Sequence, residues 1–123
     1  MKIKQLYGED SARDFKESVE RKQPKSWLKS ISAFANGMGG SLVFGVNDNG
    51  DIVGLDDVKS DTEFISDRIK ALIDPIPEFD LITKPADNGR FILEVHIPAG
   101  EMTPYYYVNS GTRTAFIRVG DES

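Results

Sequence analysis

The sequence predicts an α+β domain in which two main helices pack on a mixed, largely antiparallel sheet. Segments 24–36 and 60–73 carry apolar residues at helical spacing. Elsewhere, short apolar runs alternate with turn-forming pairs such as Asn88-Gly89, which is typical of strands joined as hairpins. With 39% hydrophobic content in 123 residues, the chain can bury one core, so we expect a single domain over residues 1–123.

The N-terminal segment has the least regular pattern. Residues 3–7 form a short extended candidate. Residues 9–19 fit either a helix or a strand around residues 14–16, and both interpretations stay open.

The central stretch predicts a helix, a strand and a turn in that order. Pro24 favours a helix start because its fixed φ suits the first turn. Asn36-Gly37 is expected to end this helix, since glycine adopts the left-handed cap conformation without steric cost. Residues 42–46 follow as a strand, and residues 47–50 predict a hairpin turn before Ile52.

The second half predicts one helix and two strand pairs. Ser60 and Glu63 have the spacing of a capping box, and Asp74-Pro75 should end the helix, because a residue before proline leaves the α region. The four expected strands pair through turns at 87–89 and 109–111 and comprise residues 79–83, 90–97, 105–108 and 114–119.

The total charge argues against nucleic-acid binding, whereas its distribution favours it locally. Fifteen basic and twenty acidic residues give a net charge of −5, unlike the basic surplus usual in nucleic-acid-binding domains. Segment 13–29 reverses this balance, with six basic residues against three acidic ones. It forms either an ordinary solvated helix start or a phosphate-facing surface.

The absence of cysteine excludes disulfides, a thiolate nucleophile and a cysteine-based zinc site. The first ten residues lack the apolar region of a signal peptide, and no run of about 18 apolar residues occurs. We therefore expect a soluble cytoplasmic protein that does not contact a membrane.

Two common kinds of site are disfavoured by the order of residues. The glycine cluster 37–40 follows a helix, whereas phosphate cradles lie between a strand and the start of a helix. A C-terminal helix cap with a tight connection to the next strand is the better interpretation. The one histidine, His96, lies on the polar side of a predicted strand, so a Ser-His triad is not indicated.

Carboxylates are the remaining candidates for chemistry. Glu9 and Asp14 lie near the N-terminus, and Asp48 follows the central strand. If the fold brings them together they would suit Mg²⁺ or Mn²⁺, because hard cations prefer oxygen ligands. Acidic residues at turns and strand ends are more often simply solvated.

Several motifs resemble the Schlafen AlbA-type domain, a family described as nucleic-acid-binding. The resemblance covers essentially the whole chain and rests on these segments: Glu9, Asp14-Phe15-Lys16, Ala33-Phe34-Ala35-Asn36, Gly39-Gly40, Phe44 to Asp48, Asp51 to Leu55, Pro104-Tyr105 and Phe116 to Gly120. The central part is long enough to make a chance match improbable.

The resemblance implies two different activities. Bacterial members commonly precede a winged-helix region in DNA-binding transcriptional regulators, and some carry an ATP-binding label. In animal members, acidic residues form a metal-dependent endoribonuclease site, which would fall here on Glu9, Asp14 and Asp48. This sequence departs from the pattern at Asp14, where a Glu is usual, and at Asn47, where an Asp is usual. It also lacks the zinc-binding Cys and His residues of the animal proteins and a helix-turn-helix pattern, so it looks like an isolated domain, natural or cut from a longer protein.

Three hypotheses follow, and we favour the first over the enzyme. The first is a nucleic-acid-binding module of a bacterial regulator, with these candidate phosphate contacts: Lys16, Lys22, Lys25, Lys29, Arg113 and Arg118. The second is an endoribonuclease that holds Mg²⁺ or Mn²⁺ with the three carboxylates. The third is an interaction or ATP-sensing domain in which residues 105–107 contact a partner or a second copy, giving a homodimer.

Overall fold

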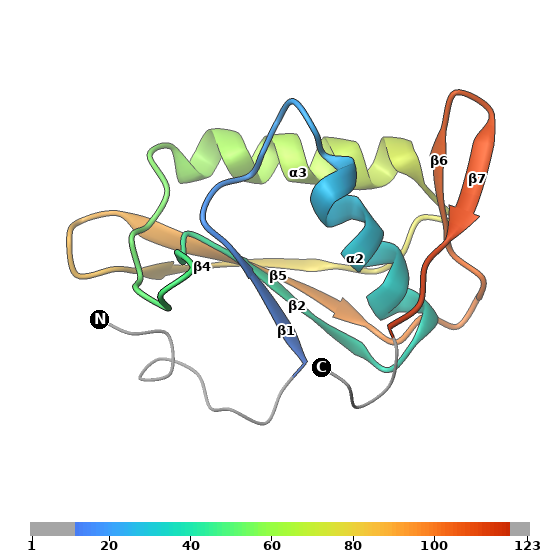
Figure 1. Cartoon of the computed structure of the whole chain (residues 1–123), viewed down its shortest axis with the longest axis horizontal. Helices are drawn as coiled ribbons and strands as arrows, with labels where there is room; N and C mark the ends of the chain where they lie inside the picture. The colour runs from blue at the N-terminus through green and yellow to red at the C-terminus, as the bar shows by residue number, and fades with distance from the viewer. Residues whose placement is uncertain (1–11, 119–123) are drawn as a thin grey trace.

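The two helices of the described residues lie against one face of a four-stranded sheet (Figure 1). The structure is a computed structural model, and it describes residues 12–118. The helices are α2 (Lys25–Asn36) and α3 (Val58–Leu72). Neither of these two described helices is long and apolar enough to cross a membrane. The predicted extended segment 3–7 lies outside the described residues.

Seven strands of the described region form two sheets, which confirms the α+β class but divides the predicted single sheet. In the first sheet the order is β1-β2-β5-β4, with β1 parallel to β2 and the other pairs antiparallel. Its strands are β1 (Arg13–Lys16), β2 (Gly39–Phe44), β4 (Asp80–Pro85) and β5 (Phe91–Pro98). The second sheet is antiparallel and contains β3 (Ile73–Asp74), β6 (Tyr106–Asn109) and β7 (Thr112–Ala115).

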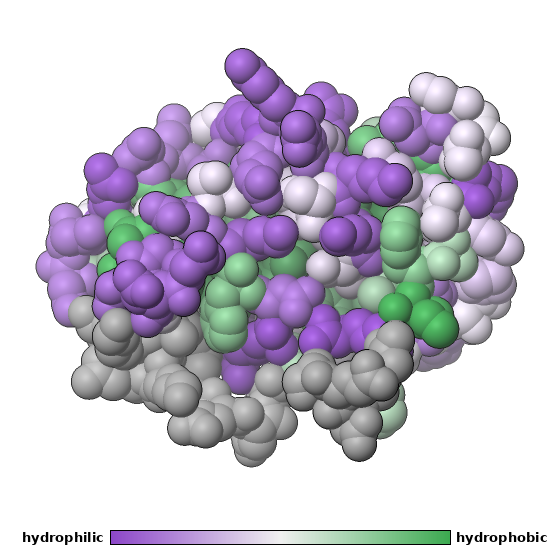
Figure 2. All heavy atoms as spheres, in the orientation of Figure 1, coloured by the Kyte–Doolittle hydropathy of each residue, from purple (hydrophilic) through white to green (hydrophobic). Residues whose placement is uncertain are grey.

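The main core lies between the helices and the four-stranded sheet. The apolar stripe predicted for α2 is buried, and the ring of Trp27 meets that of Phe44 edge-on at 5.8 Å between centroids. Alternate residues of β5 complete the layer: Leu93, Val95 and Ile97. Figure 2 shows hydrophilic side chains over most of the viewed face, with hydrophobic ones in small patches.

The N-terminal segment that sequence left open is a strand. Because β1 runs parallel to β2, the connection between them is a crossover that contains α2. Asp14 and Lys16 are paired with Leu42 and Phe44, whose side chains belong to the main core. Asp14 and Lys16 therefore lie on the helix side of the sheet.

The predicted helix ends are right to within a few residues, but two of the predicted caps are wrong. Gly37 has φ −117°, which is not left-handed, and its N–H donates to the carbonyl of Phe34 to close the last turn. Helix α3 begins before Ser60, because the side chain of Asp57 accepts a hydrogen bond from the backbone of Ser60.

Gly39 and Gly40 allow the start of β2 to pack closely against its neighbours. Gly39 has φ +86°, and a Cβ on Gly40 would lie within 2.4 Å of the ring of Phe34. This explains the tight connection from helix to strand that the sequence indicated. The last hairpin turns at Ser110-Gly111, both at positive φ, so β7 starts and ends earlier than predicted.

Candidate nucleic-acid interface

The first candidate site is a hollow of about 510 Å³ beside β1, which we call the β1 hollow. It lies where the ends of β1 and β2 meet the start of α2, an arrangement that follows from the parallel crossover. Ligands of α/β folds commonly bind outside the carboxyl ends of parallel strands. Four of the residues predicted from the sequence line it: Asp14, Lys16, Lys29 and Asp48.

The two carboxylates of the β1 hollow have different environments. Asp14 accepts a charge-assisted hydrogen bond of 2.9 Å from Arg118, whose guanidinium also lies 4.9 Å from the ring centroid of Phe34. Asp48 is exposed on the turn after β2. The neighbouring Asn47 uses its side-chain oxygen to accept bonds from two backbone N–H groups of that turn.

The third predicted carboxylate, Glu9, lies outside the described residues. Within residues 12–118, no three His, Cys, Asp or Glu side chains lie close enough together to hold a metal ion. Of the two described carboxylates in the β1 hollow, Asp14 is already paired with Arg118.

The second candidate site is a hollow of about 530 Å³, which we call the lysine hollow. Lys22, Lys25 and Lys29 line it, together with Tyr107 and Asn109 of β6, and none of its lining residues is acidic. The ammonium of Lys25 lies 5.9 Å from the ring centroid of Tyr107. No carboxylate of the described residues forms an ion pair with these three lysines.

The start of α2 adds to this positive potential. Its N-cap residue is Pro24, which provides no side-chain hydrogen bond, and its first turn contains no acidic residue. The backbone N–H groups of Ser26 and Trp27 already donate to the carbonyls of Gln23 and Pro24. It is therefore the positive end of the helix dipole, not free N–H groups, that favours anions here. The strand-then-helix order of anion sites thus occurs between β1 and α2, not at the glycine cluster.

The two hollows adjoin each other, because Ser26 and Lys29 line both. The nearest carboxylate on this side is Glu20, which accepts a hydrogen bond of 2.9 Å from Ser26 and lies 3.7 Å from the ammonium of Lys16. The sequence did not indicate Ser26 or Asn109 as site residues, and it indicated Tyr107 only within the run 105–107 that was expected to contact a partner. The spacing of three between Ser26 and Lys29 was a signal that they share one face of α2.

Besides Lys16, which lies beside Glu20, two more of the predicted phosphate contacts are engaged within the protein. Arg113 pairs with Asp74 at 3.0 Å and covers the ring of Tyr106 at 4.5 Å, and it lines neither hollow. Arg118 is held by Asp14. The structure thus brings the four predicted lysines together around α2 and separates Arg113 from them.

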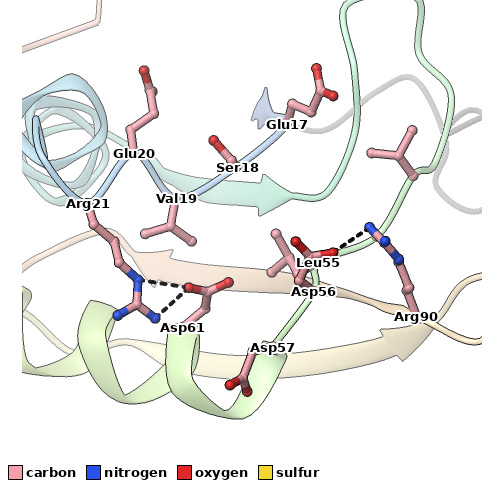
Figure 3. A pocket seen from close by; sticks show the side chains of 12 residues that line it. Glu17, Ser18, Val19, Glu20, Arg21, Leu55, Asp56, Asp57, Asp61 and Arg90 are labelled. Atoms are coloured by element: carbon pink, nitrogen blue, oxygen red, sulfur yellow. Dashed lines mark hydrogen bonds and ion pairs between the residues drawn. The ribbon is translucent and has the colours of Figure 1, made fainter.

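A third hollow, of about 500 Å³, is acidic and lies beside the start of α3 (Figure 3). Arg21 donates to Asp61 at 2.8 Å, and Arg90 lies 2.8 Å from Asp56. Figure 3 shows Glu17 pointing away from these aspartates, so the carboxylates of this acidic hollow do not converge on one point.

His96 has a polar neighbour that the sequence did not indicate. Its Nδ1 lies 3.2 Å from the hydroxyl of Ser41, which donates at 2.8 Å to Glu94. Ser41 is buried, and its single proton is directed to the carboxylate. The group therefore does not have the order of a Ser-His-acid triad.

Comparisons with known proteins support the family and the fold. The solution structure of the N-terminal domain of a protein from Nitrosomonas europaea, described as related to the ATP-dependent DNA helicase RecG, shares 22% identity. It aligns over 98% of this chain and 86% of that chain with a TM-score of 0.67. The crystal structure of the DIP2311 protein from Corynebacterium diphtheriae shares 19% identity, with 85% of this chain and 22% of that chain covered and a TM-score of 0.56.

At these identities the two structures establish a shared fold alone. The search of curated proteins gives no match. A comparison with protein families matches residues 9–123 to the family described as Schlafen, AlbA_2. The chain therefore belongs to the Schlafen AlbA_2 family.

Proposed function

We propose that this domain is the nucleic-acid-binding module of a bacterial transcriptional regulator, with DNA as its expected partner. The observation that carries the proposal is the lysine hollow, where three lysines without carboxylate partners in the described region surround the uncapped start of α2. The match to a domain of a RecG-related protein supports a role beside nucleic acid. A winged-helix domain following this one in the parent protein would supply additional contacts.

The net charge of −5 does not oppose this assignment. At physiological ionic strength, charges separated by more than about 8 Å on a surface are largely screened from one another. The acidic hollow is also partly neutralised by Arg21 and Arg90. A phosphate at the start of α2 therefore interacts mainly with the nearby lysines and the helix dipole.

The test is a titration of labelled duplex DNA and labelled transfer RNA, followed by fluorescence anisotropy over a range of salt concentrations. We expect affinity to fall linearly with salt on logarithmic axes, and Lys25→Glu/Lys29→Glu to weaken binding at least tenfold. The matched control is Lys59→Glu/Lys70→Glu, which reverses two exposed lysines of α3. Equal losses from the two double variants would remove the lysine hollow from the proposal.

An endoribonuclease is the second candidate, because Asp14 and Asp48 line one hollow beside Lys16. The described residues do not form a metal site, so we derive no step through a metal. The test is incubation of labelled transfer RNA with Mn²⁺, analysed on denaturing gels. Cleavage that disappears in both Glu9→Ala and Asp48→Asn would support the enzyme, and cleavage that survives both would exclude it.

The tyrosine run gives less support to an interaction or ATP-sensing domain. Tyr105 and Tyr107 are 3% and 7% exposed, so they belong to the core. Tyr106 is half-buried beneath Arg113. The run therefore offers little free aromatic surface to a partner or to a second copy.

A further inference from the structure

The β1 hollow and the lysine hollow are concave, and lysines that bound only phosphate groups would not need concave surfaces beside them. Their volumes of about 510 and 530 Å³ are typical of small-molecule sites, which cover about 300–1,000 Å³. Ser26 and Lys29 line both, so they form a polar ridge between two concave surfaces. A nucleic acid that contacted only its phosphates would use the ridge and leave both hollows empty.

The walls of the lysine hollow suit a nucleoside better than a phosphate alone. Pro24 and the partly buried Leu72 provide an apolar side, to which the core residue Tyr107 adds only an edge, and the exposed Asn109 provides a carboxamide at the rim. A carboxamide can donate and accept hydrogen bonds at a base edge. The lysines lie around this apolar side, where the phosphates that flank a nucleoside would lie.

We propose that the two hollows take successive nucleotides of an unpaired strand, with the phosphate between them beside Lys29 on the ridge, because the hydroxyl of Ser26 already donates to Glu20. This inference rests on the proposed function and names the nucleic acid that the site selects. The α2 amino end and Lys25 hold the next phosphate along the strand. The ligand class is therefore single-stranded nucleic acid, either DNA or RNA.

The reason for this selectivity is base accessibility. In a duplex the bases are stacked and paired, so no nucleoside can enter a hollow unless it leaves the helix, which costs a few kcal/mol. In an unpaired strand the bases are free to turn outward and contact aromatic and apolar side chains. Phosphate contacts are available to both forms, so the hollows favour the single strand.

The experiment compares a labelled single-stranded oligonucleotide with the duplex of the same sequence, titrated at equal salt by anisotropy. We expect the single strand to bind at least tenfold more tightly. Tighter or equal binding of the duplex would overturn the inference and leave the proposed function standing. Binding of neither form would overturn both.

The site is tested with Asn109→Trp, which places a large ring at the rim of the lysine hollow. We expect affinity for the single strand to fall more than affinity for the duplex, so that the preference for the single strand disappears. Thr83→Trp is the control, because it adds the same ring at an exposed position of β4, the opposite edge of the sheet from β1. Asn109→Leu repeats the test with a smaller side chain if the Trp variant does not fold by circular dichroism. If the folded variant still prefers the single strand to the duplex, the proposed placement of a nucleoside in the lysine hollow is wrong.

Discussion

The starts of the two helices differ in the charged side chains that surround the positive end of the helix dipole. At α3, Asp57 caps the helix, Asp61 lies in the first turn, and Arg21 pairs with Asp61. At α2, neither a side-chain cap nor an acidic first turn is present, and Lys22, Lys25 and Lys29 surround the end. The hollow beside each helix start has a similar volume, about 500 and 530 Å³.

The charged side chains at the start of α3 pair with one another and serve the structure, whereas the three lysines at the start of α2 are available to a ligand. An anion at a helix start stabilises it by about 0.3–1 kcal/mol, and cations there are unfavourable. Helix α3 gains this stabilisation from its own side chains. Helix α2 has no acidic residue in its first turn, and the one carboxylate that bonds a side chain there, Glu20, is also 3.7 Å from Lys16. An external phosphate would supply further negative charge when the site is filled.

The largest effect is expected from Asn36, which holds the residues just before β6 and just after β7 against the end of α2. Asn36 donates to the carbonyls of Tyr105 and Phe116 at 2.9 Å and accepts from the backbone of Tyr105 at 2.6 Å. Asn36→Ala should lower the free energy of unfolding by about 2–3 kcal/mol, because backbone groups in a buried region lose their partners. Denaturant unfolding measures this. The control Asn88→Ala removes an exposed side chain and should cost clearly less, and equal losses would contradict the role of Asn36.

The second prediction concerns a charge reversal at Lys25, the first residue of α2. Lys25→Glu should weaken nucleic-acid binding about tenfold and reduce the salt slope by about one, because one phosphate contact is lost. The same change should raise the free energy of unfolding by about 0.3–1 kcal/mol, because the new carboxylate complements the helix dipole. Opposite signs for binding and stability are the diagnostic result, measured by anisotropy and by denaturant unfolding. A loss of both would mean that Lys25 has a structural role.

The elements of this fold were predictable from sequence because they depend on local periodicity. The apolar stripe of α2 and the apolar pattern of β5 gave both elements to within a few residues. The stripe of α2 is buried, whereas Phe91 at the start of β5 is 40% exposed. The caps were harder, since Asp57 and Ser60 lie three residues apart and each suits an N-cap. Gly37 was misassigned because the positive φ occurs two residues later, at Gly39.

The candidate site depends on contacts that no local pattern contains. Lys25 and Lys29 could be selected from the charge of segment 13–29, but Tyr107 and Asn109 reach them from β6. That placement follows from the bonds of Asn36 to residues 69 and 80 positions later in the chain. The parallel pairing of β1 and β2 was also invisible, since the strand at 13–16 was itself undecided.

The third prediction concerns Asp57, the N-terminal cap of α3. Asp57→Ala should lower the free energy of unfolding by about 1 kcal/mol, because the backbone N–H of Ser60 loses its acceptor. Nucleic-acid affinity should stay within twofold of the unchanged protein, since the acidic hollow is separate from the lysines. Asp56→Ala is the control, because it removes a neighbouring exposed carboxylate that caps no helix. A fall in affinity would mean that the two helix starts are coupled.

The smallest effect is expected at Arg21, which joins the segment before α2 to the start of α3. Its guanidinium bonds Asp61 and Ser60 and lies 4.8 Å from the ring centroid of Phe64. The side chain is 45% exposed, so solvent screens the pair, and Arg21→Ala should cost only about 0.5 kcal/mol of stability. Affinity for nucleic acid should also be unchanged, although a positive charge is lost close to Lys22. Unchanged affinity would show that the acidic hollow is not part of the nucleic-acid interface, because an arginine that is paired with a carboxylate contributes little to phosphate binding. A tenfold loss would instead show that the interface extends to the acidic hollow, with Arg21 exchanging its aspartate for phosphate.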